Sequence, residues 1–117
     1  EETRNLFTRE VFKKMKKTAV FINASRGPVA NEQDLYDALK EGDIAAAGLD
    51  VFDKEPIDEN HPLLQLSNVV ALPHIGSATI ETRMGMMKLC VENIDAILSG
   101  KEPLTLVNKD WSVATKK

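Results

Sequence analysis

The chain has 117 residues, of which 43% are hydrophobic and 28% are charged, so it is long enough to bury a core of its own. Its formal net charge of −3 argues against nucleic acid or an anionic membrane surface as a partner. The single cysteine, Cys90, excludes an internal disulfide, and no apolar run reaches the roughly 18 residues of a membrane span.

The first predicted element is a short helix that begins after Thr8. Thr8 can act as its N-cap, and Phe7 and Phe12 have the spacing of a hydrophobic staple. Residues 19–22 are continuously apolar, as expected of a parallel strand that is covered on both faces. The polar sequence at residues 23–28 then ends this strand.

The second predicted helix begins after Asn31 and ends at Gly42. Asn31 is a favourable N-cap, and Leu35 and Leu39 lie on one face of the helix. Gly42 stands where a left-handed residue commonly ends a helix. Residues 45–49 are small and apolar, and we predict a strand there from the alternation of elements, because alanine alone favours a helix.

The last predicted strand, residues 69–72, is an apolar run that ends at a proline. A long helix follows either Ser77 or Thr79, both fair N-caps. Because Cys90 falls in the apolar pattern of this helix, we expect it in the core rather than as a nucleophile. The apolar side chains recur in steps of four and three, and Gly100 closes the helix after them: Ile80, Met84, Met87, Val91, Ile94 and Leu98. We expect this stripe to be core as well.

Strands that alternate with helices imply a parallel sheet with right-handed crossovers. Polar groups follow each predicted strand: Arg26 the first, Asp50 and Glu55 the second, and His74 the third. Because the carboxyl ends of parallel strands lie along one edge, we expect these groups to gather in one crevice.

An arginine, a carboxylate and a histidine in one crevice suit proton transfer to a bound acid. Arg26 offers a planar fork that matches a substrate carboxylate. Glu55 can accept a hydrogen bond from one ring nitrogen of His74, which orients the ring and favours its protonated form. His74 can then donate a proton to a carbonyl oxygen, while a cofactor supplies hydride, since no side chain carries one.

Each of these residues also has an ordinary structural interpretation. Arg26 can form a surface ion pair, Glu55 can be a loop carboxylate, and Asp50 can be a turn former. His74 can be a loop histidine that hydrogen-bonds the backbone. The convergence of all of them at one edge is what favours the chemical interpretation.

Three motifs, in this order, resemble the D-isomer-specific 2-hydroxyacid dehydrogenases. They are Asn-Ala-Ser-Arg-Gly at residues 23–27, Gly-Leu-Asp-Val-Phe with Glu-Pro within residues 48–56, and Pro-His-Ile-Gly-Ser-Ala-Thr at residues 73–79. The resemblance extends from Glu2 to about Asn108. Segments at residues 20–23, 60–64 and 72–79 are most similar to the glyoxylate/hydroxypyruvate reductase branch.

The resemblance implies a role for each site residue. Arg26 becomes the ligand of the substrate carboxylate, His74 the acid/base, Glu55 the partner of the histidine, and Asp50 a ligand of the nicotinamide carboxamide. The residues that it places at the cofactor are Ala24, Ser25, Arg26, Asp50, His74, Gly76 and Ser77. No metal ligand is implied.

The implied fold is α/β: the second half of a Rossmann-like doubly wound parallel sheet with flanking helices and a long C-terminal helix. Residues 1–100 would belong to the nucleotide-binding domain, and residues 101–117 would form a tail that returns toward a substrate domain. The implied reaction is reduction of small 2-oxo acids, such as glyoxylate and hydroxypyruvate, to 2-hydroxy acids. The cofactor would be NADP or NAD, with NADPH favoured, and the enzyme a cytoplasmic homodimer.

The family's glycine-rich turn, Gly-x-Gly-x-x-Gly, does not occur in the chain, and the first residue is not methionine. We therefore expect the chain to be about the last third of a longer enzyme and to be inactive alone. Trp111 either anchors the tail or has no structural role. Three alternatives stay open: a corepressor-like NAD(H)-binding module that recruits partners, another member of the family such as phosphoglycerate dehydrogenase, and a unit for folding or assembly only.

Overall fold

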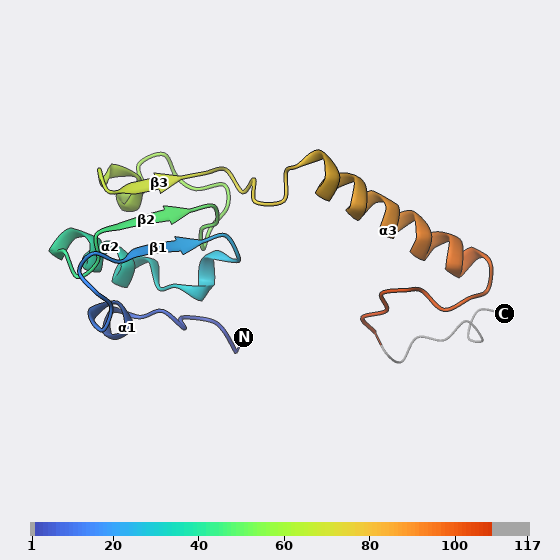
Figure 1. The fold of residues 1–117 in the computed structure, drawn as a ribbon, viewed down its shortest axis with the longest axis horizontal. Helices are drawn as coiled ribbons and strands as arrows, with labels where there is room; N and C mark the ends of the chain where they lie inside the picture. The colour runs from blue at the N-terminus through green and yellow to red at the C-terminus, as the bar shows by residue number, and fades with distance from the viewer. Residues whose placement is uncertain (1, 109–117) are drawn as a thin grey trace. The chain divides into compact units, whose positions relative to one another are not determined.

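Three parallel strands lie at the centre of the first of two units in the computed structural model (Figure 1). The strands β1 (Val20–Asn23), β2 (Ala46–Leu49) and β3 (Val69–Ala71) lie side by side in the order β1-β2-β3. The register places Ile22 opposite Gly48, and Gly48 opposite Val70. The predicted parallel sheet is confirmed, and each strand lies within about one residue of its expected bounds.

The structure describes residues 2–108, and its two units comprise residues 1–76 and 77–117. Trp111 and the rest of the predicted tail beyond Asn108 lie outside the described residues. Among the helices that the structure describes, none is long and apolar enough to cross a membrane.

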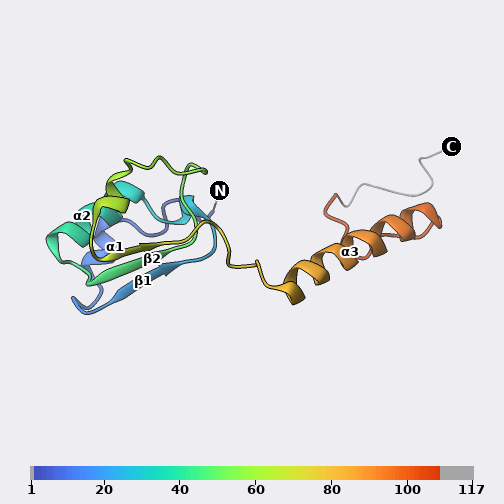
Figure 2. The ribbon, with the colours of Figure 1, turned by 90° about the horizontal axis from the view of Figure 1, so that it is seen from above.

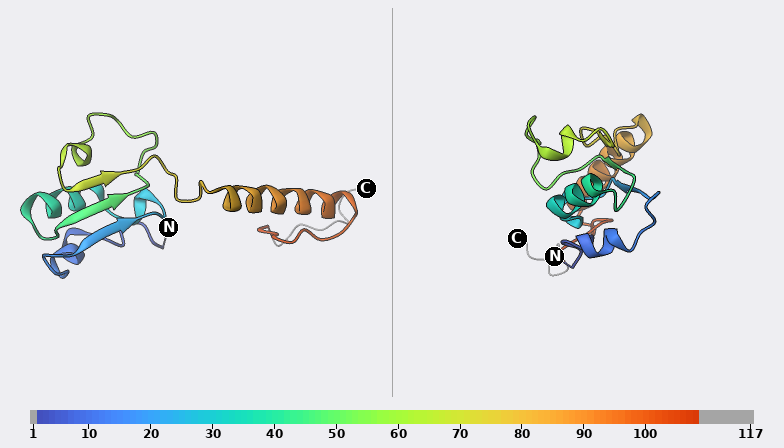
Figure 3. Two further views of the ribbon diagram at one scale, coloured as in Figure 1. Left: turned by 45° about the horizontal axis from the view of Figure 1, so that its top comes forward. Right: turned by 90° about the vertical axis from the view of Figure 1, so that its left-hand side faces the viewer.

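The helices of the first unit pack on one face of the sheet (Figure 2). Phe21, Ala47 and Leu49 point to this face and join one hydrophobic cluster with side chains from the helices. The views in Figure 3 show the same layering. The elements on this face are α1 (Arg9–Lys13), α2 (Glu32–Glu41) and the short 3-10 helix η2 (Pro62–Gln65); a second 3-10 helix, η1, spans Gly27–Val29.

Three phenylalanines close the core between α1 and the sheet. The rings of Phe7 and Phe12 lie 6.2 Å apart in a stacked arrangement, which confirms the predicted hydrophobic staple. Phe21 on β1 lies 5.0 Å from the first ring and 5.2 Å from the second, in tilted and edge-on contacts. These contacts fix α1 against the strand that leads to the candidate site.

The opposite face of the sheet is open within the first unit. Ile22 is 73% exposed and Val70 is 65% exposed. The expectation that the first strand is covered on both faces is therefore wrong for this unit. The physical reason is the strand order: crossovers of one hand that advance in one direction place their connecting elements on the same side of a sheet.

Local capping decides where α2 begins and ends, whereas a residue distant in sequence supports the start of α1. The Asn31 side chain accepts a hydrogen bond from the Asp34 N–H at 3.0 Å, and Gly42 has φ 74°, so both predicted ends of α2 are confirmed. Thr8 occupies the N-cap position of α1, but its side chain makes no cap hydrogen bond. Instead, Asp34 accepts from the Arg9 N–H at 3.0 Å, so a residue distant in sequence satisfies the first turn.

The second unit contains the long helix α3 (Ile80–Leu98). Thr79 is its N-cap, with its hydroxyl oxygen accepting from the Thr82 N–H at 3.2 Å, and Gly100 follows it with φ 70°. None of the described residues of α3 is buried, and Cys90 is exposed. The expectation that the stripe and Cys90 lie in a core is wrong here, because α3 is the only helix or strand among the described residues of this unit, 77–108.

Candidate active site

Loops leave the three strands at their carboxyl ends, and these loops carry all of the site residues that the sequence indicates, with Ser77 in the loop after β3. The loop after β1 contains Ala24, Ser25 and Arg26, the loop after β2 contains Asp50 and Glu55, and the loop after β3 contains His74 and Gly76. All of these belong to the first unit, whereas Ser77 is the first residue of the second. The parallel sheet therefore brings together three segments that are distant in sequence.

Asn23 organises the first loop, a role that the sequence interpretation missed. This residue is 5% exposed, and its amide oxygen accepts from the Ser25 N–H at 3.1 Å and from the Ser25 hydroxyl at 2.9 Å. Its amide nitrogen donates to the Arg26 carbonyl at 3.0 Å. An asparagine at a strand end, followed by small residues, is the signal of such a turn.

Gly27 lets the first two loops approach each other, and it too was missed. A Cβ atom at this position would lie 1.9 Å from the Phe52 carbonyl carbon and 2.3 Å from the Asp53 nitrogen. These are backbone atoms, so no rotamer change could relieve the overlap. The absence of a side chain at Gly27 therefore sets the position of Arg26 relative to the loop that holds Glu55.

Glu55 and His74 form a direct contact across two loops. The Glu55 Oε2 atom lies 2.7 Å from the His74 Nδ1 atom, and Oε1 accepts from the Phe52 N–H at 3.0 Å. Because an ionised carboxylate only accepts, Nδ1 carries a hydrogen, and Nε2 is the nitrogen available to a ligand. The two side chains are 45% and 37% exposed for His74 and Glu55 respectively, so a ligand can reach the pair.

The surroundings of Glu55 favour its charged form. The hydrogen bond with His74 lowers the pKa of the Glu55 carboxyl most, the Phe52 N–H lowers it further, and burial partly opposes both. The charges of His74 and Arg26 act in the same lowering direction. A lowered pKa means that the carboxylate form is present at neutral pH and is lost only as the pH falls below the usual carboxyl range.

Arg26, Glu55 and His74 line one hollow of about 340 Å³. Arg26 also donates from Nη1 to its neighbour's carbonyl, that of Ser25, at 2.7 Å. This hollow therefore combines a guanidinium with a carboxylate-oriented imidazole, which suits an anionic ligand that needs a proton.

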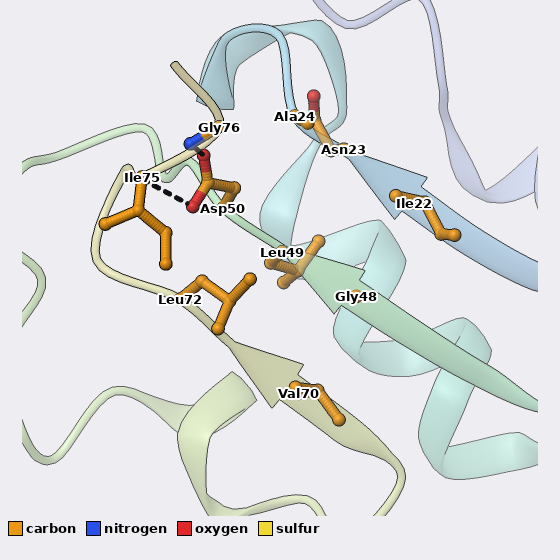
Figure 4. A pocket seen from close by; sticks show the side chains of 10 residues that line it. All are labelled: Ile22, Asn23, Ala24, Gly48, Leu49, Asp50, Val70, Leu72, Ile75 and Gly76. Atoms are coloured by element: carbon orange, nitrogen blue, oxygen red, sulfur yellow. Dashed lines mark hydrogen bonds between the residues drawn. The ribbon is translucent and has the colours of Figure 1, made fainter. Parts of the chain in front are cut away.

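A second cavity, of about 360 Å³, lies at the carboxyl ends of the strands (Figure 4). Ala24, Asp50 and Gly76 line it, and they are three of the residues that the resemblance places at the cofactor. The other residues of that set are not in its lining: Ser25, Arg26, His74 and Ser77. The rest of the lining is Asn23 and mainly apolar residues: Ile22, Gly48, Leu49, Val70, Leu72 and Ile75. An apolar cavity with few polar groups is typical of a site for a small organic ligand.

Asp50 is 6% exposed, and both of its carboxylate oxygens are already engaged. Oδ1 accepts from the Ile75 N–H at 2.8 Å and Oδ2 from the Gly76 N–H at 2.7 Å (Figure 4). The resemblance implies a bond from Asp50 to a nicotinamide carboxamide. In the structure, the Asp50 carboxylate binds two backbone N–H groups of the loop that contains His74.

Comparison with known proteins gives concordant matches. The family model described as "D-isomer specific 2-hydroxyacid dehydrogenase, NAD binding domain" matches residues 1–76. A glyoxylate/hydroxypyruvate reductase B from Escherichia coli is 55% identical over 108 residues, which are 92% of this chain and 33% of that protein. The chain thus spans about a third of the length of the curated relatives that it matches.

Solved structures match over the same share of the chain. The NADPH-dependent glyoxylate/hydroxypyruvate reductase from Sinorhizobium meliloti, crystallised with NADP and malonate, is 40% identical with a TM-score of 0.84. The match covers 92% of this chain and 33% of that one. The D-mandelate dehydrogenase of Rhodotorula graminis, in its holo form, is 35% identical with a TM-score of 0.85, over 96% of this chain and 32% of that one.

Proposed function

Because the chain belongs to the D-isomer specific 2-hydroxyacid dehydrogenase family, we propose that it supplies the proton-transfer residues of a reductase of small 2-oxo acids. The product is the corresponding 2-hydroxy acid. The observation that carries the proposal is the Glu55–His74 contact at 2.7 Å in a hollow that Arg26 also lines. Glyoxylate and hydroxypyruvate are the proposed substrates, because the E. coli and S. meliloti relatives bear those names.

His74 is the proposed proton donor in reduction. Glu55 holds Nδ1, so Nε2 presents its proton to the carbonyl oxygen of the substrate. In the reverse direction, the neutral ring accepts the hydroxyl proton at the same nitrogen. The Glu55 carboxylate, whose pKa is lowered, stabilises the positive charge of the ring before the proton leaves it.

The cavity at the carboxyl ends of the strands fits the nicotinamide end of NADPH or NADH. Its lining is mainly apolar, and Gly48 adds no side chain to it. The bound reduced nicotinamide supplies the hydride, which no amino-acid side chain carries. Ala24 and Gly76 border this cavity, and His74 lines a further cavity that shares Asp50 and Leu72 with it. We propose NADPH as the preferred cofactor, since relatives were crystallised with NADP or NADPH.

We also propose how the chain is divided between the domains of the whole enzyme. Residues 1–100 would belong to the nucleotide-binding domain and residues 101–117 to a tail that returns toward a substrate domain. We further propose a homodimer in the cytoplasm for the whole protein, as expected from the family resemblance.

A hybrid reductase tests the proposed function. In this hybrid, the chain replaces the matching 108-residue segment of the E. coli glyoxylate/hydroxypyruvate reductase B. We expect the hybrid to oxidise NADPH in the presence of glyoxylate or hydroxypyruvate. A folded hybrid that binds NADPH but turns over neither these nor other small 2-oxo acids would refute the proposal.

Arg26→Lys in the hybrid reductase should raise KM for the 2-oxo acid by about tenfold to a hundredfold, with a smaller effect on kcat. Lysine keeps the positive charge but cannot place two parallel N–H groups on a carboxylate. Initial-rate measurements over a range of substrate concentrations give both constants. Arg4→Lys is the matched control, because Arg4 is not in the lining of this hollow and forms an exposed 3.8 Å ion pair with Asp53. Equal KM values for the two variants would show that Arg26 does not bind the substrate.

Glu55→Gln should lower the pH above which kcat/KM for reduction declines. The substitution keeps the shape and one acceptor but removes the negative charge that lies 2.7 Å from the ring. Without this charge the positively charged form of the pair is less stabilised, so reduction should decline earlier as the pH rises. The measurement is kcat/KM against pH for both proteins. If the decline in kcat/KM stays at the same pH or moves to higher pH, Glu55 is an ordinary loop carboxylate without a role in proton transfer.

A further inference from the structure

We propose that Asp50 is a positioning residue that holds the backbone at His74 in a left-handed conformation and so sets the geometry of the Glu55–His74 pair. The structural part of this inference stands by itself, and its consequence for catalysis rests on the function proposed above. It differs from the role implied by the family resemblance, in which Asp50 binds the nicotinamide carboxamide.

The backbone of His74 has φ 55°, a value that residues with a side chain rarely adopt. Such a conformation persists only where the surroundings hold it. The N–H groups that follow His74 are both held by a single side chain: Ile75 donates to one oxygen of Asp50 at 2.8 Å and Gly76 to the other at 2.7 Å. Two bonds to one carboxylate fix the direction of the chain immediately after the histidine.

We call the two hydrogen bonds from Ile75 and Gly76 to the Asp50 carboxylate the Asp50 clamp. Asp50 is well suited to this role. It is 6% exposed and directly follows β2, the central strand of the sheet, so its own position is fixed by the core. The approach of the clamped segment is close, since a Cβ atom at Gly76 would lie 2.9 Å from Asp50 Oδ2. Glycine at this position therefore permits the second of the two bonds.

The pair itself needs such support. His74 is 45% exposed and Glu55 is 37% exposed, so packing does not immobilise either side chain. The His74 ring reaches Glu55 because its backbone directs it there. A small displacement of a catalytic group from its reacting geometry can lower the rate by about a hundredfold.

Asp50→Asn in the hybrid reductase separates the clamp from its alternatives. The amide keeps one acceptor but turns an NH₂ group toward the other backbone N–H, which leaves that donor unpaired. Without cofactor, we expect amide hydrogen exchange in the segment around residues 74–76 to be roughly tenfold faster or more. Asp58→Asn is the matched control, because Asp58 also accepts a backbone N–H, from Asn60 at 2.8 Å, in an exposed loop.

Kinetics with two cofactors distinguish the clamp from carboxamide binding. We expect Asp50→Asn to lower kcat by about a hundredfold. The same loss should occur with NADPH and with its 3-acetylpyridine analogue, in which a methyl group replaces the amino group of the carboxamide. A loss that disappears with the analogue, together with unchanged exchange at residues 74–76, would overturn the proposal and assign Asp50 to the cofactor.

Gly76→Ala keeps the inference testable if Asp50→Asn does not fold. This substitution leaves the Asp50 carboxylate intact but adds a methyl group close to its Oδ2 atom. The same faster amide exchange around residues 74–76 is therefore expected. Unchanged exchange in this variant would count against the clamp. A wild-type hybrid without turnover would refute the proposed function alone, since exchange in the cofactor-free protein still decides whether Asp50 holds the segment.

Discussion

His74→Ala in the hybrid reductase is expected to lower kcat by about two to four orders of magnitude, the usual contribution of a positioned acid or base. The affinity for NADPH should remain near that of the wild type, because the imidazole makes its interaction mainly in the transition state. A loss of this kind lowers kcat and kcat/KM together. The measurements are steady-state kinetics and NADPH binding by fluorescence titration.

The chain provides a matched control for this variant in its other histidine, His61. The His61 Nε2 atom lies 3.4 Å from Glu32, and Nδ1 accepts from the Leu63 N–H at 3.3 Å. This ring is not part of the lining of the hollow. His61→Ala should therefore retain turnover close to that of the wild type. Wild-type turnover in His74→Ala would show that this histidine is not the acid/base.

Gly27→Ala is expected to disrupt both the first unit and substrate binding. The added methyl group would lie 1.9 Å from the Phe52 carbonyl carbon and 2.1 Å from its oxygen, so the two loops must separate. Overpacking of this kind costs typically about 1–3 kcal/mol of unfolding free energy and occasionally more. Arg26 moves with the loop, so KM for the 2-oxo acid should rise as well. Chemical denaturation of the 117-residue chain measures the first effect, and kinetics of the hybrid measure the second.

Gly48→Ala is the matched control for stability. A Cβ atom at Gly48 would meet only Ile22 Cγ1, at 3.8 Å, which is ordinary van der Waals contact. Because alanine restricts the unfolded chain more than glycine, this variant should be as stable as the wild type or slightly more stable. Equal unfolding free energies for Gly27→Ala and Gly48→Ala would contradict the close approach seen at Gly27.

Those parts of the fold that depend on local chemistry could be predicted from the sequence. The Asn31 side chain caps the first turn of α2, and Gly42 ends the helix in a left-handed conformation. Asparagine and glycine favour these roles at the ends of helices in general. The proximity of Glu55 and His74 could be predicted from topology, because both residues lie in loops that leave their strands at one edge of a parallel sheet.

Features that depend on distant partners could not be predicted in this way. Thr8 loses its capping role because Asp34, from another helix, binds the first turn of α1. The apolar stripe of α3 and Cys90 show that periodicity identifies an apolar face but not what covers it. The engagement of both Asp50 oxygens and the need for glycine at Gly27 arise from close approaches of backbone, which a single sequence does not reveal.

The role of the Glu55–His74 pair is tested most directly by kcat/KM of the hybrid reductase against pH in both directions, with substrates whose own ionisation is constant over the range. If His74, paired with Glu55, gives and takes the proton, reduction should decline as the pH rises, while oxidation of the 2-hydroxy acid should increase. Both limbs should move to lower pH in Glu55→Gln. Limbs that run in the same direction, or that do not respond to Glu55→Gln, would contradict the assignment of the Glu55–His74 pair as the proton-transfer site.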